Sequence, residues 1–368
     1  MHHLNHENNS KVLIKLGIES FQERFPWIGA DLQTLRDSFP SEKLYLGKNN
    51  IVEISVPSMP GRVNTQGKLM AILNLPKSYI DASGLVLILH GLGGSSKRHG
   101  LCRMSKSLLD AGFAVLRLNL RGASPGRHLA PGTYSAKCST DLFPVFNFAS
   151  DFLSLHSKNK LSSKKIPFYG VGISLGGTIL LNACLDKENS NSFSLDGLVC
   201  TSSPLDLEEC SKSIERNRNL IYQNWLLNRL VSQTLSDPFE CEAKEYYNLR
   251  SGFVSSIRDF DELITAPRWG YNSVQEYYIQ ASPLTKLAQN SSRLPPSIFL
   301  QSYDDPWVPV GSTYALKDIL DRDKIKTSDI VITDKGGHNG FHGKNGCWGD
   351  DLVCSWLKKH SASLINHS

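Results

Sequence analysis

The chain has no apolar run that approaches the roughly 20 residues needed to cross a bilayer as a helix. Its first segment, Met1–Lys15, is polar, rich in His and Asn, and has no apolar stretch of the kind that a secretory signal needs. These absences exclude a helical membrane span and predict a cytoplasmic protein, although they leave peripheral contact with a membrane open.

Sequence motifs for cofactors are missing as well. No G-x-G-x-x-G loop, Walker loop or H-E-x-x-H helix occurs, so we expect no requirement for a nucleotide, phosphate or zinc cofactor. The formal net charge of +5 is small for 368 residues and the basic residues are scattered, which argues against a nucleic-acid partner. The eight cysteines form no C-x-x-C pair, and we expect reduced, mostly buried thiols.

What the sequence does contain is a distinctive turn after an apolar strand. The run Gly172-Ile173-Ser174-Leu175-Gly176 has the pattern G-x-S-x-G and lies between the apolar segments Ile166–Val171 and Thr178–Cys184. In α/β-hydrolases this pattern forms the nucleophile elbow, a strained turn that exposes the serine hydroxyl above the sheet. Both glycines are needed there, because a Cβ would collide where strand and helix cross. The alternative is a glycine-rich strand–helix turn of some other α/β protein.

Strand and helix patterns alternate around this turn. We expect an antiparallel pair of strands at Ile51–Val56 and Lys68–Leu75. Further strands are expected at Leu85–Leu89, Phe113–Leu118, Ile166–Val171, Gly197–Thr201, Ser297–Gln301 and Asp329–Thr333. Helices are expected at Lys97–Ala111, Thr140–Lys158, Gly311–Arg322 and Gly349–Ser363. The predicted class is α/β, an α/β-hydrolase fold whose mostly parallel, twisted sheet carries helices on both faces.

The alternation stops between Leu205 and Ser282, where no strand pattern is visible but Asn219–Thr234 and Val274–Ile279 have helical spacing. We interpret this stretch as a helical cap over the sheet. The expected organisation is therefore an N-terminal extension at 1–50 packed on the core, an α/β-hydrolase core at 51–204 and 283–368, and a cap insertion at 205–282.

A serine nucleophile needs a base, and the base needs an acid to orient it. In α/β-hydrolases both follow the serine, the acid before the histidine. Asp304 and Asp305 come shortly after one predicted strand, and His338 comes shortly after the next. Because the carboxyl ends of parallel strands meet at one edge of the sheet, these side chains should lie near Ser174.

We predict Ser174, Asp305 and His338 as the catalytic residues. Asp305 is preferred because Asp-x-x-Val-Pro is the usual phrase in this fold. Asp304 remains an alternative for the acid, and Asp206 is a weaker one.

Two backbone N–H groups are needed for an oxyanion hole. One should be that of Leu175, directly after the nucleophile. The other should come from the loop His90-Gly91-Leu92-Gly93-Gly94, which resembles the HG-type motif, and we assign it to Leu92. His90 is interpreted as a structural histidine that shapes this loop.

These phrases together resemble the YheT-like branch of the α/β-hydrolase superfamily, which is similar to plant embryogenesis-associated hydrolases and animal α/β-hydrolase-domain proteins. The matching phrases are Asp31-Leu32-Gln33-Thr34-Leu35, His90-Gly91-Leu92-Gly93-Gly94, Arg117-Leu118-Asn119-Leu120-Arg121-Gly122, Gly172-Ile173-Ser174-Leu175-Gly176-Gly177, Asp304-Asp305-Pro306 and Gly337-His338-Asn339-Gly340-Phe341. Asp31 and Ile173 stand where the family usually has histidine. The resemblance implies a serine hydrolase that acts on carboxylic esters, but it does not identify the substrate.

The predicted function is therefore a cytoplasmic serine esterase without a cofactor, acting through an acyl-enzyme on small-molecule esters, including lipid or short-to-medium acyl esters. In the proposed cap, Trp225, Leu226, Leu227 and Leu230 either line an acyl pocket or pack the cap onto the sheet. An acyltransferase or a peptidase that uses the same three residues, and a catalytically silent binding protein, are the alternatives.

Overall fold

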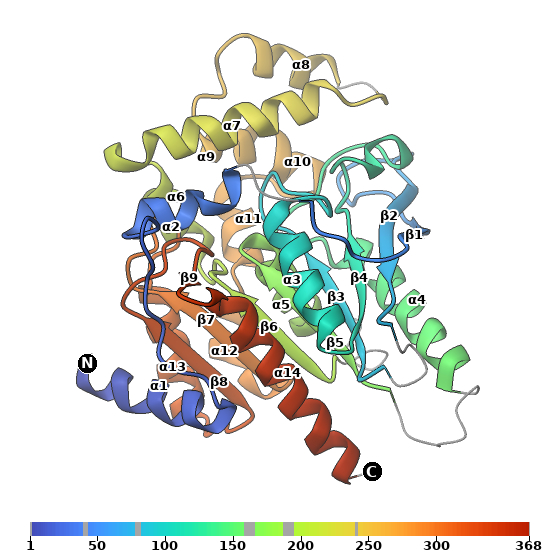
Figure 1. The fold of residues 1–368 in the computed structure, drawn as a ribbon. Coiled ribbons are helices and arrows are strands. Elements are labelled where there is room, and N and C mark those ends of the chain that lie inside the picture. The colour runs from blue at the N-terminus through green and yellow to red at the C-terminus, as the bar shows by residue number, and fades with distance from the viewer. Residues whose placement is uncertain are drawn as a thin grey trace.

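The computed structural model describes residues 2–39, 43–77, 82–157, 166–186, 195–239 and 242–367. In these ranges, eight strands form one sheet in the order β1-β2-β4-β3-β5-β6-β7-β8 (Figure 1). They are β1 (Asn50–Val56), β2 (Gly67–Asn74), β3 (Leu85–Leu89), β4 (Ala114–Leu118), β5 (Phe168–Ile173), β6 (Gly197–Thr201), β7 (Ser297–Ser302) and β8 (Ser328–Thr333). The pairs β1–β2 and β2–β4 are antiparallel, and the pairs from β4 through β8 are parallel. Every predicted strand is present, with bounds shifted by two residues or fewer.

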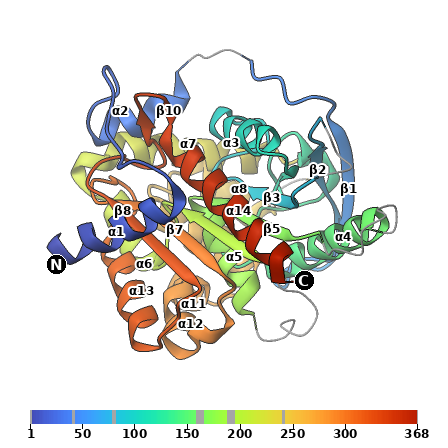
Figure 2. The same cartoon turned by 60° about the horizontal axis from the view of Figure 1, so that its bottom comes forward.

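Helices cover both faces of this sheet. In Figure 2, α3 and α14 lie on one side of the sheet, and α12 and α13 lie on the other. The described α-helices outside the 205–282 region are α1 (His2–Leu16), α2 (Ala30–Leu35), α3 (His99–Asp110), α4 (Ser139–Ser157), α5 (Leu175–Leu185), α12 (Pro283–Gln289), α13 (Gly311–Arg322) and α14 (Trp348–His367). The predicted α/β-hydrolase architecture is confirmed.

The sequence of β3 explains why this strand lies at the centre of the sheet. All five of its residues are buried. Leu85, Leu87 and Leu89 join the hydrophobic cluster on the side of α4 and α5, while Val86 and Ile88 join the cluster on the side of α3 and α14. A strand that is apolar on both faces can lie only in the interior of such a sheet.

The N-terminal residues form an element that the sequence analysis did not predict. Helix α1 packs against β8 and α14, and its Val12 and Leu13 are buried. The Asn9 side chain extends the pairing at the free edge of β8, since its Oδ1 accepts a hydrogen bond from the Ile332 N–H at 3.1 Å. Its Nδ2 donates to the carbonyl of the same residue. The helix therefore covers an edge that would otherwise leave backbone groups unpaired.

Residues 205–239 and 242–282 contain helices but no strand. The elements are α6 (Leu207–Ile214), η5 (Asn217–Asn219), α7 (Leu220–Leu235), α8 (Ala243–Arg250), α9 (Ile257–Phe260), the π-helical turn η6 (Asp261–Thr265), α10 (Ala266–Arg268) and α11 (Val274–Ala281). The two helices expected here correspond to α7 and α11. In Figure 1, α7 and α8 lie across the end of the molecule above α2, α6 and α9.

Among the described helices, none is both long and apolar enough to cross a bilayer. Seven cysteines in the described ranges are free thiols, three of them buried and four partly buried. Cys241 and the end of the predicted helix at Lys158 lie outside the described residues.

Candidate active site

Ser174 lies between the end of β5 and the start of α5, in the turn predicted from G-x-S-x-G. Its backbone has φ 55° and ψ −127°, a combination that is strained for a residue with a side chain. A Cβ at Gly172 would overlap the backbone of Gly177, and a Cβ at Gly176 would lie 2.5 Å from the Leu89 carbonyl oxygen. The glycines therefore permit the close crossing of strand and helix that exposes the serine hydroxyl.

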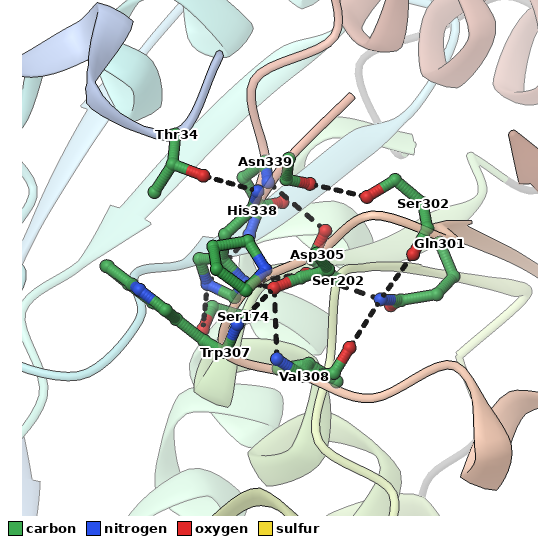
Figure 3. A network of polar contacts seen from close by, with 12 residues as sticks. Thr34, Ser174, Ser202, Gln301, Ser302, Asp305, Trp307, Val308, His338 and Asn339 are labelled. Carbon is green, nitrogen blue, oxygen red and sulfur yellow. Dashed lines mark hydrogen bonds and ion pairs between the residues drawn. The ribbon is translucent and has the colours of Figure 1, made fainter. Parts of the chain in front are cut away.

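The structure brings Ser174, His338 and Asp305 into one hydrogen-bonded chain (Figure 3). The Oγ of Ser174 lies 2.9 Å from the Nε2 of His338. The Nδ1 of His338 lies 2.9 Å from Oδ2 and 3.2 Å from Oδ1 of Asp305. Both the imidazole and the carboxylate are almost fully removed from solvent. Such a chain can take a proton from the serine and stabilise the imidazolium that results.

The carboxylate of Asp305 is held by the loop after β7. Its Oδ1 accepts hydrogen bonds from the N–H groups of Trp307 at 2.8 Å and Val308 at 3.0 Å. Gln301, the penultimate residue of β7, donates its Nε2 to Oδ2 of Asp305 at 3.3 Å and to the Val308 carbonyl at 3.0 Å. The Trp307 ring packs on the His338 ring, with centroids 4.4 Å apart. These contacts fix the direction in which the carboxylate faces the histidine.

The two alternative acids lie in other environments. The Oδ1 of Asp304 accepts a hydrogen bond from the Gly337 N–H at 2.9 Å, and burial raises the pKa of this carboxyl. Asp206 caps the N-terminus of α6, where its Oδ1 accepts from the Glu209 N–H at 3.0 Å. Asp304 therefore supports the loop that carries His338, whereas Asp206 orders a helix in the 205–282 region.

The loop that carries His338 is fastened to α2, a contact that the sequence analysis missed. The His338 N–H donates to Oγ1 of Thr34 at 2.8 Å, and the Thr34 hydroxyl in turn donates to the Ala30 carbonyl at 2.7 Å. Gln33, which is 1% exposed, donates to the His342 carbonyl at 3.0 Å and accepts from the His342 N–H at 2.8 Å. The N-terminal region thus contributes directly to the position of the imidazole.

A second set of contacts fixes the same loop from the side of the sheet. Asn339 has φ 57°, its N–H donates to Ser202 Oγ at 3.2 Å, and its Oδ1 accepts from Thr201 Oγ1 at 2.7 Å. The Ser302 hydroxyl donates to the Gly337 carbonyl at 2.7 Å. Sequence reasoning could not find these partners, because each comes from a strand end far away in the chain.

The predicted oxyanion loop lies against Ser174, the predicted nucleophile. A Cβ at Gly91 would lie 2.9 Å from the Cβ and 3.3 Å from the Oγ of Ser174, so only glycine fits there. The loop is tied down where Gly93 N–H donates to the Tyr134 hydroxyl at 2.7 Å. This arrangement places the segment with Leu92 beside Ser174, and Leu175 follows the serine as the first residue of α5.

His90 shapes this loop and takes no part in the Ser174 chain. Its Nδ1 lies 2.9 Å from the Gly91 carbonyl, and its Nε2 accepts the Leu120 N–H at 3.2 Å. Burial lowers the pKa of His90 to about 4, so the ring is neutral at pH 7 and donates through Nδ1. The predicted structural role is confirmed by these contacts.

A cavity of about 300 Å³ opens beside Ser174 and His338 and reaches under the helices of the 205–282 region. Apolar side chains that line it include Leu207, Ile214, Trp225, Leu226 and Ile257 from this region and Trp307 from the loop after β7. Leu227 and Leu230 do not line it, because they pack with Phe260 and Ile264 inside the helical region. Of the four residues considered for an acyl pocket, Trp225 and Leu226 line the cavity and the other two pack.

Within the described ranges, no three His, Cys, Asp or Glu side chains converge as a metal ion would require. His342, four residues after His338, instead places its Nε2 3.3 Å from Oδ1 of Asp37.

Comparisons with known proteins agree with the fold of the chain. The family model described as the alpha/beta hydrolase fold matches residues 84–344. The chain is 29% identical over 267 residues to "Phospholipase ABHD3" of Bos taurus, covering 72% of this chain but only 60% of that protein. It is 27% identical over 282 residues to "Putative esterase YheT" of Escherichia coli, covering 74% of this chain and 76% of the relative. A solved esterase from Rhizomucor miehei superposes with a TM-score of 0.54 at 16% identity, covering 88% and 86% of the two chains.

Proposed function

Because the chain belongs to the α/β-hydrolase fold family, and within it to the YheT-like branch, we propose that it is a serine esterase that cleaves carboxylic esters through Ser174, His338 and Asp305. The observation that carries the proposal is the continuous chain of hydrogen bonds from the Ser174 hydroxyl through both ring nitrogens of His338 to the buried Asp305. The names of the relatives, an esterase and a phospholipase, support an ester substrate.

In the proposed reaction, the Ser174 hydroxyl attacks the ester carbonyl while Nε2 of His338 takes its proton. The N–H groups of Leu92 and Leu175 bind the carbonyl oxygen as it becomes negative. His338 then gives the proton to the leaving alcohol, and the acyl group stays on Ser174. Water, deprotonated by His338, attacks the acyl-enzyme and regenerates the serine. Asp305 keeps the ring oriented in every step.

We also propose that residues 205–282 act as a cap on a core of residues 51–204 and 283–368, with residues 1–50 as an extension on that core. The apolar side chains of Trp225 and Leu226 suit an acyl chain, since burial of each methylene contributes roughly 0.8 kcal/mol. We further propose that the protein is cytoplasmic.

The test is labelling with a fluorophosphonate probe, followed by a panel of p-nitrophenyl esters of graded acyl length. We expect labelling of the wild-type protein that is lost in Ser174→Ala, together with turnover of the esters. Absence of both would favour a silent binding protein. Transfer of the acyl group to an added alcohol faster than to water would instead assign acyltransferase activity.

A further inference from the structure

Two arginines lie over the ring of one cavity residue. The guanidinium carbons of Arg98, which precedes α3, and Arg229, from α7, lie 5.6 Å and 5.7 Å from the centroid of the Trp225 ring. Arg98 and Trp225 line the same cavity as Ser174. The Nε of Arg229 donates to the carbonyl of Gly93 in the oxyanion loop. The arginine pair is therefore adjacent to the place where an ester would react.

This pair carries positive charge that the surrounding protein does not balance. Among the described residues, no carboxylate lies within ion-pair distance of Arg98 or Arg229, although both are partly buried. Burial lowers the pKa of both side chains, and the charge of Arg229 lowers that of Arg98 further. Holding two such charges near each other costs free energy unless an anion is present.

The buried Arg117 is held by neutral partners, among them Oδ1 of Asn74 at 2.9 Å and the Ser96 carbonyl at 2.7 Å. Three other arginines with little solvent exposure are paired with acids. The partners are Asp37 and Asp350 for Arg103, Asp141 for Arg121, and Glu245 for Arg268.

Carboxylates that share the cavity have their own partners. Asp37 and Asp350 both pair with Arg103. Asp261, in the π-helical turn η6, accepts a hydrogen bond from the Tyr278 hydroxyl at 2.9 Å. These carboxylates therefore do not neutralise the arginine pair, and an anionic ligand would do so.

We propose that Arg98 and Arg229 form a subsite for a phosphate group carried by the ester that is cleaved at Ser174. Guanidinium groups bind phosphate oxygens through paired, charge-assisted hydrogen bonds. Two separate guanidinium groups match the several oxygens of a phosphate better than the two of a carboxylate. The Trp225 ring holds both cations in place. Because this subsite is built from side chains of distant segments, it leaves no phosphate-loop motif in the sequence. The inference rests on the proposed ester hydrolysis.

The kinetic test compares two soluble esters that differ only in the phosphate: 1,2-dihexanoylglycerol 3-phosphate and 1,2-dihexanoylglycerol, both below their micelle concentrations. The readout is the ratio of kcat/KM for the phosphate ester to that for the neutral ester. We expect this ratio to fall about 10- to 100-fold in Arg98→Gln and in Arg229→Gln, the loss typical of a charge-assisted hydrogen bond. The ratio for Arg98→Lys should lie between those of Arg98→Gln and the wild type, because lysine keeps the positive charge and lacks the planar guanidinium fork.

Arg250→Gln is the matched control, because Arg250 also lies over an aromatic ring, that of Tyr246, but is exposed on α8. Its ratio should equal that of the wild type. An unchanged ratio in both Arg98→Gln and Arg229→Gln would overturn the subsite. The subsite would also be overturned if these two substitutions weakened only the binding of the protein to phosphatidylserine vesicles. That result would assign the arginines to a membrane surface.

A binding experiment separates this proposal from the proposed function. Calorimetry of the Ser174→Ala protein measures affinity for the same two compounds without turnover. Tighter binding of the phosphate ester that is lost in Ser174→Ala/Arg98→Gln supports the subsite even if the wild-type protein cleaves neither ester. Equal affinity for the two compounds would reject the subsite while esterase activity stands.

Discussion

The Nε2 atom of His338 lies 2.9 Å from the Oγ atom of Ser174, although 164 residues separate the two in the chain. The distance is that of a hydrogen bond, so the proton of the serine has a direct path to the ring. Neither residue moves freely: Ser174 is held by its strained turn, and the loop of His338 is held by α2 and by the ends of β6 and β7.

Ser174→Ala should lower ester turnover by roughly 10⁴-fold or more, because it removes the nucleophile. Thermal stability should hardly change, since the substitution deletes one hydroxyl at a strained position. Steady-state kinetics and a thermal melt measure the two effects. Ser236→Ala, at an exposed serine after α7, is the control. If Ser174→Ala kept a tenth of the activity, the nucleophile would be a different residue.

Asp305→Asn should reduce kcat by about 10⁴-fold, because an amide favours the wrong tautomer of His338. Asp304→Asn should have a smaller effect, because its side-chain oxygen can still accept the Gly337 N–H. Kinetics of both variants with one p-nitrophenyl ester decide between them. If Asp304→Asn lowered kcat more than Asp305→Asn, the acid would be Asp304. If neither substitution lowered kcat, Asp206 would be the remaining candidate for the acid.

Thr34→Val should reveal how α2 positions the base. Valine has the same shape but cannot accept the His338 N–H, and an unpaired buried donor costs ~1–3 kcal/mol. We expect kcat to fall at least about tenfold with little change in KM, because the imidazole is displaced from the serine. Thr34→Ser keeps the acceptor and should restore kcat. A loss of stability alone, with kcat intact, would limit Thr34 to a structural role.

Trp225→Ala should enlarge the cavity and shift the preference toward longer acyl chains. The ratio of kcat/KM for the octanoate to the acetate p-nitrophenyl ester should rise by roughly tenfold. Ile221→Ala is the matched control, because Ile221 is 82% exposed on the same helix and does not line the cavity. An unchanged ratio together with a lower melting temperature would assign Trp225 to packing.

His90 should make folding sensitive to acid. Its folded pKa of about 4 lies below its ordinary value of 6.5, so the unfolded chain takes up the proton first as the pH falls. The stability that His90 contributes is complete above pH 6.5 and is lost between pH 6.5 and 4, by at most roughly 3 kcal/mol. Urea unfolding at pH 7 and pH 4.5 measures this loss.

The comparison variants are His90→Gln and, at an exposed histidine, His128→Gln. His90→Gln should be less stable at pH 7, where it loses ring contacts, but should show a weaker dependence on pH. His128→Gln should keep the wild-type dependence. Equal pH dependence in all three proteins would mean that His90 is not the group responsible.

Much of the fold follows from short patterns along the chain. Apolar runs such as Leu85–Leu89 are typical of strands buried on both sides inside a parallel sheet. G-x-S-x-G between an apolar strand and an apolar helix predicts the turn found at Ser174. Helix α1 escaped prediction because its sequence is polar and has only a short apolar segment around Val12 and Leu13. Its stability comes from packing on β8 and α14, which local propensity does not report.

The amino-acid sequence by itself determined the strand order along the chain, the strained serine turn, and the rim positions of Asp305 and His338, because each depends on residues close together in sequence. Only the tertiary structure decided that Thr34 holds the His338 loop, that Gln301 holds the Asp305 carboxylate, and that Arg98 and Arg229 meet over Trp225. These contacts join segments far apart in the chain. A hydrogen bond or a ring contact depends on distance and direction in space, and those arise only once the sheet and its helices have packed.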